Sequence, residues 1–147
     1  MDKQSEVFQG LVCDSQQPPE EELWDLFDRA HFHVPDNYKD RWFTGSLTSI
    51  SVRDAVTNQL VAYTSVRSLD FGLEWQDLAV DPGYQQRGIG RALGDAIIEK
   101  ARLLPAREPW MKLYAKPAHG LADRYRTLHG FHDSDDGMLV LELTPVE

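Results

Sequence analysis

The chain has 147 residues, the size of one domain with room for a sheet covered by helices. Its hydrophobic share of 41% and charged share of 27% are typical of a globular protein and exclude a disordered or fibrous class. The net charge of −9 argues against binding to nucleic acid or to an anionic membrane, and the single cysteine, Cys13, rules out an intramolecular disulfide and a multi-cysteine zinc site.

The first third of the chain predicts one strand and one helix. Residues 7–12 have the apolar character of a strand, although Gly10 interrupts them. A helix is predicted to begin after Pro18–Pro19, since proline is common at a helix start. Glu20–Glu22 support this start, because they place negative charge in the first turn, where the helix dipole favours it. Residues 31–45 are expected to form a further helix or a loop with aromatic anchors.

From Ser46 onward apolar and polar residues alternate, which is typical of strands. The segment Ser46–Val66 predicts an antiparallel hairpin with a polar turn at Thr57–Gln59. Leu73–Val80 predicts a further strand that ends at Asp81. Strict alternation places four side chains of that strand on one face, namely Glu74, Gln76, Leu78 and Val80.

Two helices, a short strand between them and a closing hairpin are predicted for the rest of the chain. Apolar residues recur every three or four positions over Ile89–Ala101, which indicates an amphipathic helix. The segment Trp110–Ala115 predicts a short buried strand. Residues 117–129 predict a helix that Gly130 stops, and residues 131–143 predict a closing hairpin.

Three glycines, Gly83, Gly88 and Gly90, lie in or next to the short loop between the predicted strand and the amphipathic helix. Glycine permits a ligand to approach the backbone closely. The free N–H groups at the start of a helix and the helix dipole favour an anion, and Arg87 and Arg91 would reinforce that preference. The loop is therefore the candidate phosphate site.

Two common phosphate-binding motifs do not fit this loop. Gly83 and Gly88 have the spacing of a P-loop, but Ile89-Gly90 follows in place of the lysine and the serine or threonine. A dinucleotide fingerprint that starts at Gly88 and Gly90 would need its third glycine at position 93, but the chain has its next glycine one position later, at Gly94.

The loop closely resembles the acetyl-CoA signature of the GNAT superfamily of N-acetyltransferases, which is Gln/Arg-x-x-Gly-x-Gly/Ala after a strand. Here the signature reads Gln85-x-x-Gly88-x-Gly90, and its lead-in is Leu78-Ala79-Val80-Asp81-Pro82. The likeness covers roughly Ser46–Leu143 in the order of elements. It implies a single α/β domain, residues 1–147, with a mixed and mostly antiparallel sheet of six or seven strands and helices on both faces.

The resemblance also implies where coenzyme A binds. Backbone groups of the strand would bind the pantetheine arm, and N–H groups at the start of the helix would hold the pyrophosphate. The implied cofactor-binding residues are Leu78, Ala79, Val80, Gln85, Gln86, Arg87, Gly88, Ile89, Gly90 and Arg91.

An amine acceptor has to lose a proton before it attacks a thioester, because the pKa of an amine such as lysine is about 10.4. Glu74 stands four residues before Leu78, where histone acetyltransferases of the GNAT superfamily carry a glutamate base, and it is the candidate base here. The alternative is an edge-strand glutamate that faces solvent. A backbone N–H near Leu78–Val80 would stabilise the oxyanion, as is usual in the superfamily.

The candidate proton donor is Tyr125. Many GNAT relatives carry a tyrosine in a helix that reads Phe-Tyr-x-x-Leu-Gly-Phe, but counting back from Phe131 gives Arg126 at that position. Tyr125 comes one residue earlier, about 100° around an α-helix. The alternatives are Tyr114, His119 or solvent as the acid, with Tyr125 as a core aromatic.

The remaining histidines and aromatics give weaker signals. The spacing of His129 and His132 with nearby aspartates matches no zinc or calcium pattern, so we predict a solvated turn and no metal. The segment His31–His33 stays unassigned. Some large aromatics would line a pocket for an apolar or aryl-bearing amine, although most are expected in the core: Trp24, Trp42, Phe43, Trp75 and Trp110.

The resemblance implies acetyl transfer from acetyl-CoA to an amine. The acidic composition favours a small cationic acceptor, such as an arylalkylamine, a polyamine or an aminoglycoside-like molecule, because a negative field concentrates cations. Lysine or N-terminal amines of proteins stay open as acceptors. So does a non-catalytic acyl-CoA-binding regulatory module, which the displaced tyrosine favours. A nucleotide-binding regulatory domain would need the lysine and magnesium ligand that the loop lacks.

The sequence leaves the oligomeric state open, a homodimer included. The start of the chain lacks the pattern of a signal peptide, and no apolar run approaches membrane-spanning length. These features predict a cytoplasmic protein.

Overall fold

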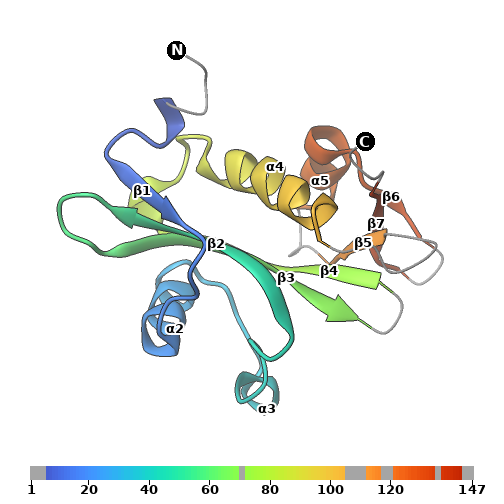
Figure 1. The fold of residues 1–147 in the computed structure, drawn as a ribbon, viewed down its shortest axis with the longest axis horizontal. Helices are drawn as coiled ribbons and strands as arrows, with labels where there is room; N and C mark the ends of the chain where they lie inside the picture. Colours follow the sequence, from blue (N-terminus) through green and yellow to red (C-terminus); the bar gives the residue numbers. More distant parts are fainter. Residues whose placement is uncertain (1–5, 70–71, 105–111, 117–120, 135–136, 144–147) are drawn as a thin grey trace.

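A computed structural model of the chain describes residues 6–69, 72–104, 112–116, 121–134 and 137–143. Within these residues the core element is a seven-stranded sheet in the order β1-β2-β3-β4-β5-β7-β6. Every pair of neighbouring strands is antiparallel except β4 and β5, which are parallel. Helices α4 and α5 lie on one side of the sheet, and α2 and α3 lie on the other (Figure 1). The predicted mixed, mostly antiparallel sheet with helices on both faces is confirmed.

The strands are β1 (Leu11–Asp14), β2 (Ser46–Asp54), β3 (Leu60–Leu69), β4 (Gly72–Val80), β5 (Lys112–Ala115), β6 (His132–Asp133) and β7 (Leu139–Glu142). The helices are α2 (Glu20–Arg29), α3 (Asp36–Lys39), α4 (Ile89–Arg102) and α5 (Ala122–His129), with a 3₁₀ turn, η1 (Pro82–Tyr84), before α4. None of these helices has both the length and the apolar composition of a membrane span.

The prediction for the first strand was wrong in its position. Glu6 and Val7 lie in a helical turn, and the strand begins only at Leu11. Gly10, with φ +77°, ends the turn and redirects the chain, so it is the boundary of the strand and not an interruption within it. Val7 and Phe8 instead pack against the core cluster beneath α4.

The other predicted elements are present where the structure describes them. The hairpin of β2 and β3, the strand β4, the helix α4 and the hairpin of β6 and β7 follow the predicted order. Only Asp36–Lys39 is helical in the segment 31–45. Trp110 and Pro117, which were predicted to lie at the starts of β5 and of the last helix, are outside the described residues.

The sheet separates two apolar clusters. One lies under α4 and contains Trp75, Leu93 and Ile97. The other lies under α2 and contains Leu23, Phe27 and the β3 residue Tyr63 (their exposed fractions are 2% or less). The apolar faces of the two amphipathic helices therefore anchor opposite faces of the same strands.

A bulge in β4 reverses the facing of its side chains. Ser65 of β3 pairs with Asp77, but the next β3 residue pairs with Trp75, which leaves Gln76 as an extra residue. Trp75 and Leu78 therefore both pack on the α4 side, while Ala79 belongs to the α2 cluster. The prediction that Glu74, Gln76, Leu78 and Val80 share one face was wrong, because the extra residue shifts the alternation by one.

The same bulge opens the sheet. The parallel pairing of β4 with β5 covers Leu73–Trp75 and stops there. From Gln76 to Val80 no described strand pairs with β4 on that side. This stretch of β4 is the floor of the cleft described next.

Candidate active site

One large cleft, of about 1370 Å³, runs along the open part of β4. Its walls come from β4, the start of α4, α5 and the segment between α2 and β2. Both predicted catalytic residues, Glu74 and Tyr125, line it. So do all the predicted cofactor-binding residues except Arg87.

The α4 end of the cleft has the form of an anion site. Gly88 is the N-cap of α4 with φ +87°, a left-handed conformation that favours glycine, and no side chain caps the first turn. Ile89 is buried and fixes the first turn against the core. The first turn carries no acidic residue, and Arg91 lines the cleft. Main-chain N–H groups and the positive end of the helix dipole are therefore left for an anionic ligand.

The loop before α4 is held from both sides. Asp81 accepts a hydrogen bond from the Gly83 amide (2.8 Å) and forms an ion pair with Arg29 of α2. The Gln85 side-chain amide donates to the Val80 carbonyl (3.0 Å), so the loop folds back onto the end of β4. These contacts fix the loop before any ligand binds.

Arg87 points away from the cleft. Its guanidinium donates to the carbonyls of Val7 (3.4 Å) and Gln9 (3.0 Å) and lies over the ring of Tyr84. The cations that line the cleft are instead Arg41, Arg67, Arg91, Lys116 and Arg124. Of these, Arg91, Lys116 and Arg124 have no ion-pair partner in the described part of the chain, and Arg91 lies on α4 itself.

Tyr125 faces the cleft although it is one position early in the helix. Its ring stacks on Trp75, with centroids 4.6 Å apart and planes 18° apart. Arg126, which has the position expected for the tyrosine, forms ion pairs with Asp123 and Asp133 (2.7 Å each) outside the cleft. Burial, and then the charge of Asp77, raise the pKa of Tyr125 to about 12. The hydroxyl therefore keeps its proton at neutral pH.

Of the other predicted acids, Tyr114 lies on β5 with its ring against Gly72 and does not line the cleft, and His119 is outside the described residues.

Glu74 is not the solvent-facing edge glutamate that the sequence left as an alternative. Strand β4 lies between β3 and β5, and the Glu74 side chain is only 15% exposed. Its carboxylate accepts from Arg67 Nε of β3 at 2.5 Å, as an ion pair.

Asp77 is a site residue that the sequence reasoning missed. It is 3% exposed and is the only charged residue among the buried residues that the structure describes. Its two carboxylate oxygens accept from Ser65 Oγ (2.9 Å) and Trp42 Nε1 (3.3 Å). Burial raises the pKa of Asp77 to about 7, and the negative charge of Glu74 adds to the rise. A signal was available in the sequence: Asp77 lies two residues from Trp75 and two from Ala79, at one of the alternate positions that are buried in this strand.

The end of the cleft beyond the bulge is aromatic. Phe32 and Trp42 meet edge to face, with centroids 6.2 Å apart, and Tyr38 lies nearby in the same wall. The unassigned histidines His31 and His33 line this end too. Trp24 and Phe43, in contrast, pack against the α2 cluster and do not line the cleft.

His129 was predicted in a solvated turn, and this was wrong. Its side chain is only 4% exposed, lies edge-on to Trp75 and contacts Asp95 Oδ1 at 3.1 Å. Burial lowers the pKa of His129 in spite of that carboxylate. It is a packing residue between α5 and α4. Over the residues with a defined position, no group of three or more histidine, cysteine or acidic side chains forms a metal site.

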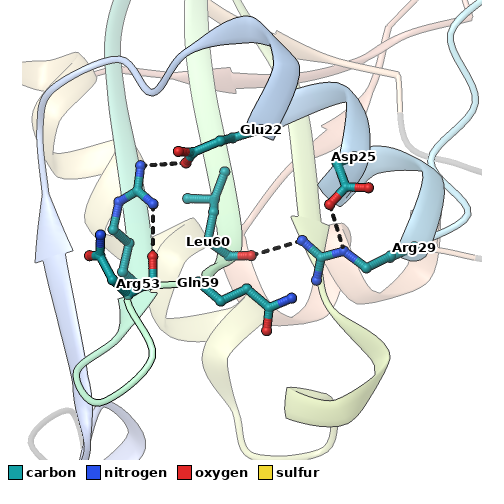
Figure 2. Close-up of a pocket in the computed structure, with 7 residues that line it drawn as sticks. Glu22, Asp25, Arg29, Arg53, Gln59 and Leu60 are labelled. Atoms are coloured by element: carbon teal, nitrogen blue, oxygen red, sulfur yellow. Dashed lines mark hydrogen bonds and ion pairs between the residues drawn. The ribbon is translucent and has the colours of Figure 1, made fainter.

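A second, smaller hollow of about 190 Å³ lies between α2 and the β2–β3 hairpin (Figure 2). Its charges pair with each other: Arg53 with Glu22 (2.6 Å) and Arg29 with Asp25 (3.5 Å). Arg29 also donates to the Leu60 carbonyl (3.0 Å), so these contacts tie α2 to the hairpin. We interpret this hollow as structural.

Comparison with known families agrees with this geometry. The family described as "Acetyltransferase (GNAT) family" matches residues 13–136. The chain therefore belongs to the GNAT acetyltransferase family, and it is an acyltransferase. None of the curated proteins matches the chain.

Solved structures share the fold at low sequence identity. The ribosomal-protein-S18-alanine N-acetyltransferase from Escherichia coli is 16% identical, with a TM-score of 0.62 over 93% of this chain and 96% of that one. GNAT family acetyltransferases from Elizabethkingia anophelis (18% identical, 91% and 99% covered) and Brucella melitensis (14%, 92% and 89%) both reach a TM-score of 0.66. Both of those structures were solved with acetyl-CoA.

Proposed function

We propose that the chain is a single N-acetyltransferase domain that moves the acetyl group of acetyl-CoA to a small amine with an aromatic or apolar body. The observation that supports this most is the continuity of the cleft. It joins uncapped amides at the start of α4 to the carboxylates Glu74 and Asp77 and to the hydroxyl of Tyr125.

The residues of the α4 end fit coenzyme A. Amides from Gln86 to Arg91 would hold the diphosphate, and Lys116 and Arg124 would add positive charge to the cleft. The open edge of β4 at Leu78–Val80 would bind the extended arm by main-chain hydrogen bonds. When bound, coenzyme A supplies an activated acetyl thioester.

The acceptor would enter at the aromatic end. The aromatic residues Phe32, Tyr38 and Trp42 that line this end suit an aryl group, and Trp42 donates a hydrogen bond to the buried carboxylate of Asp77. This favours an arylalkylamine over a polyamine or an aminoglycoside, which would present more hydroxyl and ammonium groups than this wall can pair. Tyr125 would give its proton to the departing thiolate.

The rival function is a catalytically silent acyl-CoA-binding module. Its support was the displaced tyrosine, but α5 turns Tyr125 into the cleft and Arg126 out of it. The position of Tyr125 therefore favours the enzyme.

The release of free CoA thiol tests the proposal. With acetyl-CoA present, we expect 2-phenylethylamine to raise thiol release at least about 10-fold over the rate without amine. The matched control is N,N-dimethyl-2-phenylethylamine, a tertiary amine that cannot form a stable amide, and it should not raise the rate. Spermidine, kanamycin and a short lysine-containing peptide with a free N-terminus complete the panel. Tight acetyl-CoA binding without thiol release for any amine would support the silent module instead.

A further inference from the structure

The cleft holds two carboxylates, and their surroundings divide their roles. Glu74 already has a charged partner, because Arg67 Nε lies 2.5 Å from its carboxylate. Asp77 has no cation among its described contacts, only the neutral donors Ser65 and Trp42. The two carboxylates therefore differ in their partners, because a cation is bound to Glu74 and only neutral groups are bound to Asp77.

We propose that Asp77, and not Glu74, accepts the proton of the acceptor amine. This inference rests on the proposed N-acetyltransferase function and names the group that performs one step of it. Three observations carry it. The side chain is buried in the sheet and yet lines the cleft, it lies behind the aromatic wall where an amine would enter, and the hydrogen bonds that its carboxylate accepts come from the neutral residues Ser65 and Trp42.

The bulge in β4 explains why Asp77 is available for this role. If β4 alternated regularly through Gln76, with no bulge, Asp77 would share the face of Trp75 and lie under α4, inside the apolar cluster. The bulge turns it to the face of Trp42, and the Gln76 side-chain amide donates to the Trp42 carbonyl. The same irregularity thus opens the sheet edge and places the carboxylate beside the opening.

The proton balance of the step is as follows. One N–H proton of the ammonium passes to Asp77, and the freed nitrogen lone pair forms the bond to the acetyl carbonyl carbon. The carbon–sulfur bond breaks with its electron pair on sulfur. A second N–H proton of the amine neutralises the thiolate, by way of Tyr125 or water, and Asp77 returns its proton to water.

The pH dependence follows from the groups that face Asp77. These are Glu74 on its own strand, Tyr63 on β3 and Tyr125 on α5, together with Arg67, which reaches Glu74. These four residues lie near Asp77 but donate no hydrogen bond to it; its donors are Ser65 and Trp42. Burial is the main cause that raises the pKa of Asp77 to about 7. The carboxylate is therefore mostly charged, and able to accept a proton, only above neutral pH. The rate should therefore rise with pH through about 7.

The test compares Asp77→Asn with Glu74→Gln, using CoA release with 2-phenylethylamine. We expect Asp77→Asn to lower kcat/KM about 100-fold near pH 7.5 and to remove the rise near pH 7, while Glu74→Gln keeps that rise. The β,β-difluoro analogue of 2-phenylethylamine has a much less basic amine, which needs less help to lose its proton. With this amine Asp77→Asn should regain at least about 10-fold of the lost kcat/KM. Equal losses for both amines, or a rise that survives in Asp77→Asn and disappears in Glu74→Gln, would overturn the proposal.

Two further measurements keep the test decisive. Asn is compatible with the site, since its carbonyl can accept from Trp42 and its amide can donate to Ser65 after the hydroxyl rotates.

Ser65→Ala is the second variant. It removes a hydrogen bond that lowers the pKa of Asp77, so the inflection should move to higher pH, and an unmoved inflection would contradict the proposal. If the wild-type chain released no CoA with any amine, the proposed function and this inference would fail together; release with an unchanged Asp77→Asn profile would remove this inference alone.

Discussion

Replacing Gly88 by valine should weaken acetyl-CoA binding by about 100-fold or more. Gly88 adopts φ +87° at the N-cap of α4, a conformation that costs an L-residue about 1–2 kcal/mol and a β-branched residue more. Its added side chain would also meet Val7 Cγ2, which lies 3.4 Å from the position of a Cβ. Relief of the backbone strain would turn the first amides of α4 away from the diphosphate. Isothermal titration calorimetry with acetyl-CoA measures the change in Kd.

The matched control is Gly137→Val. Gly137 has the same φ of +87°, in the turn before β7; no atom of the described residues lies within 4 Å of the position of its Cβ, and it does not line the cleft. It should lose stability by the same backbone mechanism and still bind acetyl-CoA with the wild-type Kd. Equal loss of binding in both variants would mean that strain, and not the position of the amides, is responsible.

Replacing Gly94 by alanine should destabilise the fold by about 1–3 kcal/mol, which lowers Tm by roughly 3–10 °C. Inside a helix, glycine to alanine ordinarily stabilises by up to about 1 kcal/mol, so the expected sign is reversed. The reason is close packing. A Cβ at Gly94 would lie 2.6 Å from the His129 ring and 2.9 Å from Trp75. Since Trp75 carries the stacked Tyr125, the cleft wall should shift as well.

Gly90→Ala provides the comparison within the same helix. The nearest atom to a Cβ at Gly90 is Leu78 Cδ2 at 3.9 Å, an ordinary contact, so the melting temperature of the free protein should stay the same or rise slightly. Thermal melts of the two variants beside wild type measure the difference. If Gly94→Ala were as stable as Gly90→Ala, the proposed close packing of α4 against the His129 ring would be contradicted.

The sequence predicted those parts of the fold that depend on local spacing. The hairpin of β2 and β3, the helix α4 and the loop that begins it follow from patterns within about twenty residues of one another. The predicted cofactor-binding residues, except Arg87, then fall along one cleft because β4, the loop and α4 are consecutive in the chain.

The parts that depend on distant partners could not be predicted in this way. The bulge at Gln76 is set by the pairing of β4 with β3, and strict alternation within β4 cannot reveal it. That single extra residue gave the wrong face for Glu74 relative to Leu78. The direction in which the Tyr125 side chain points is likewise set by its stacking on Trp75, fifty residues earlier in the chain. The number of residues between Tyr125 and Phe131, on which the sequence argument relied, does not determine it.

The most direct test of the account is a calorimetric titration of the wild-type chain with acetyl-CoA, paired with a thermal melt at saturating ligand. The account predicts saturable heat at one site per chain, a higher Tm in the presence of acetyl-CoA, and weaker binding at high salt because main-chain amides and arginines hold the phosphates. The absence of both heat and thermal protection would contradict it.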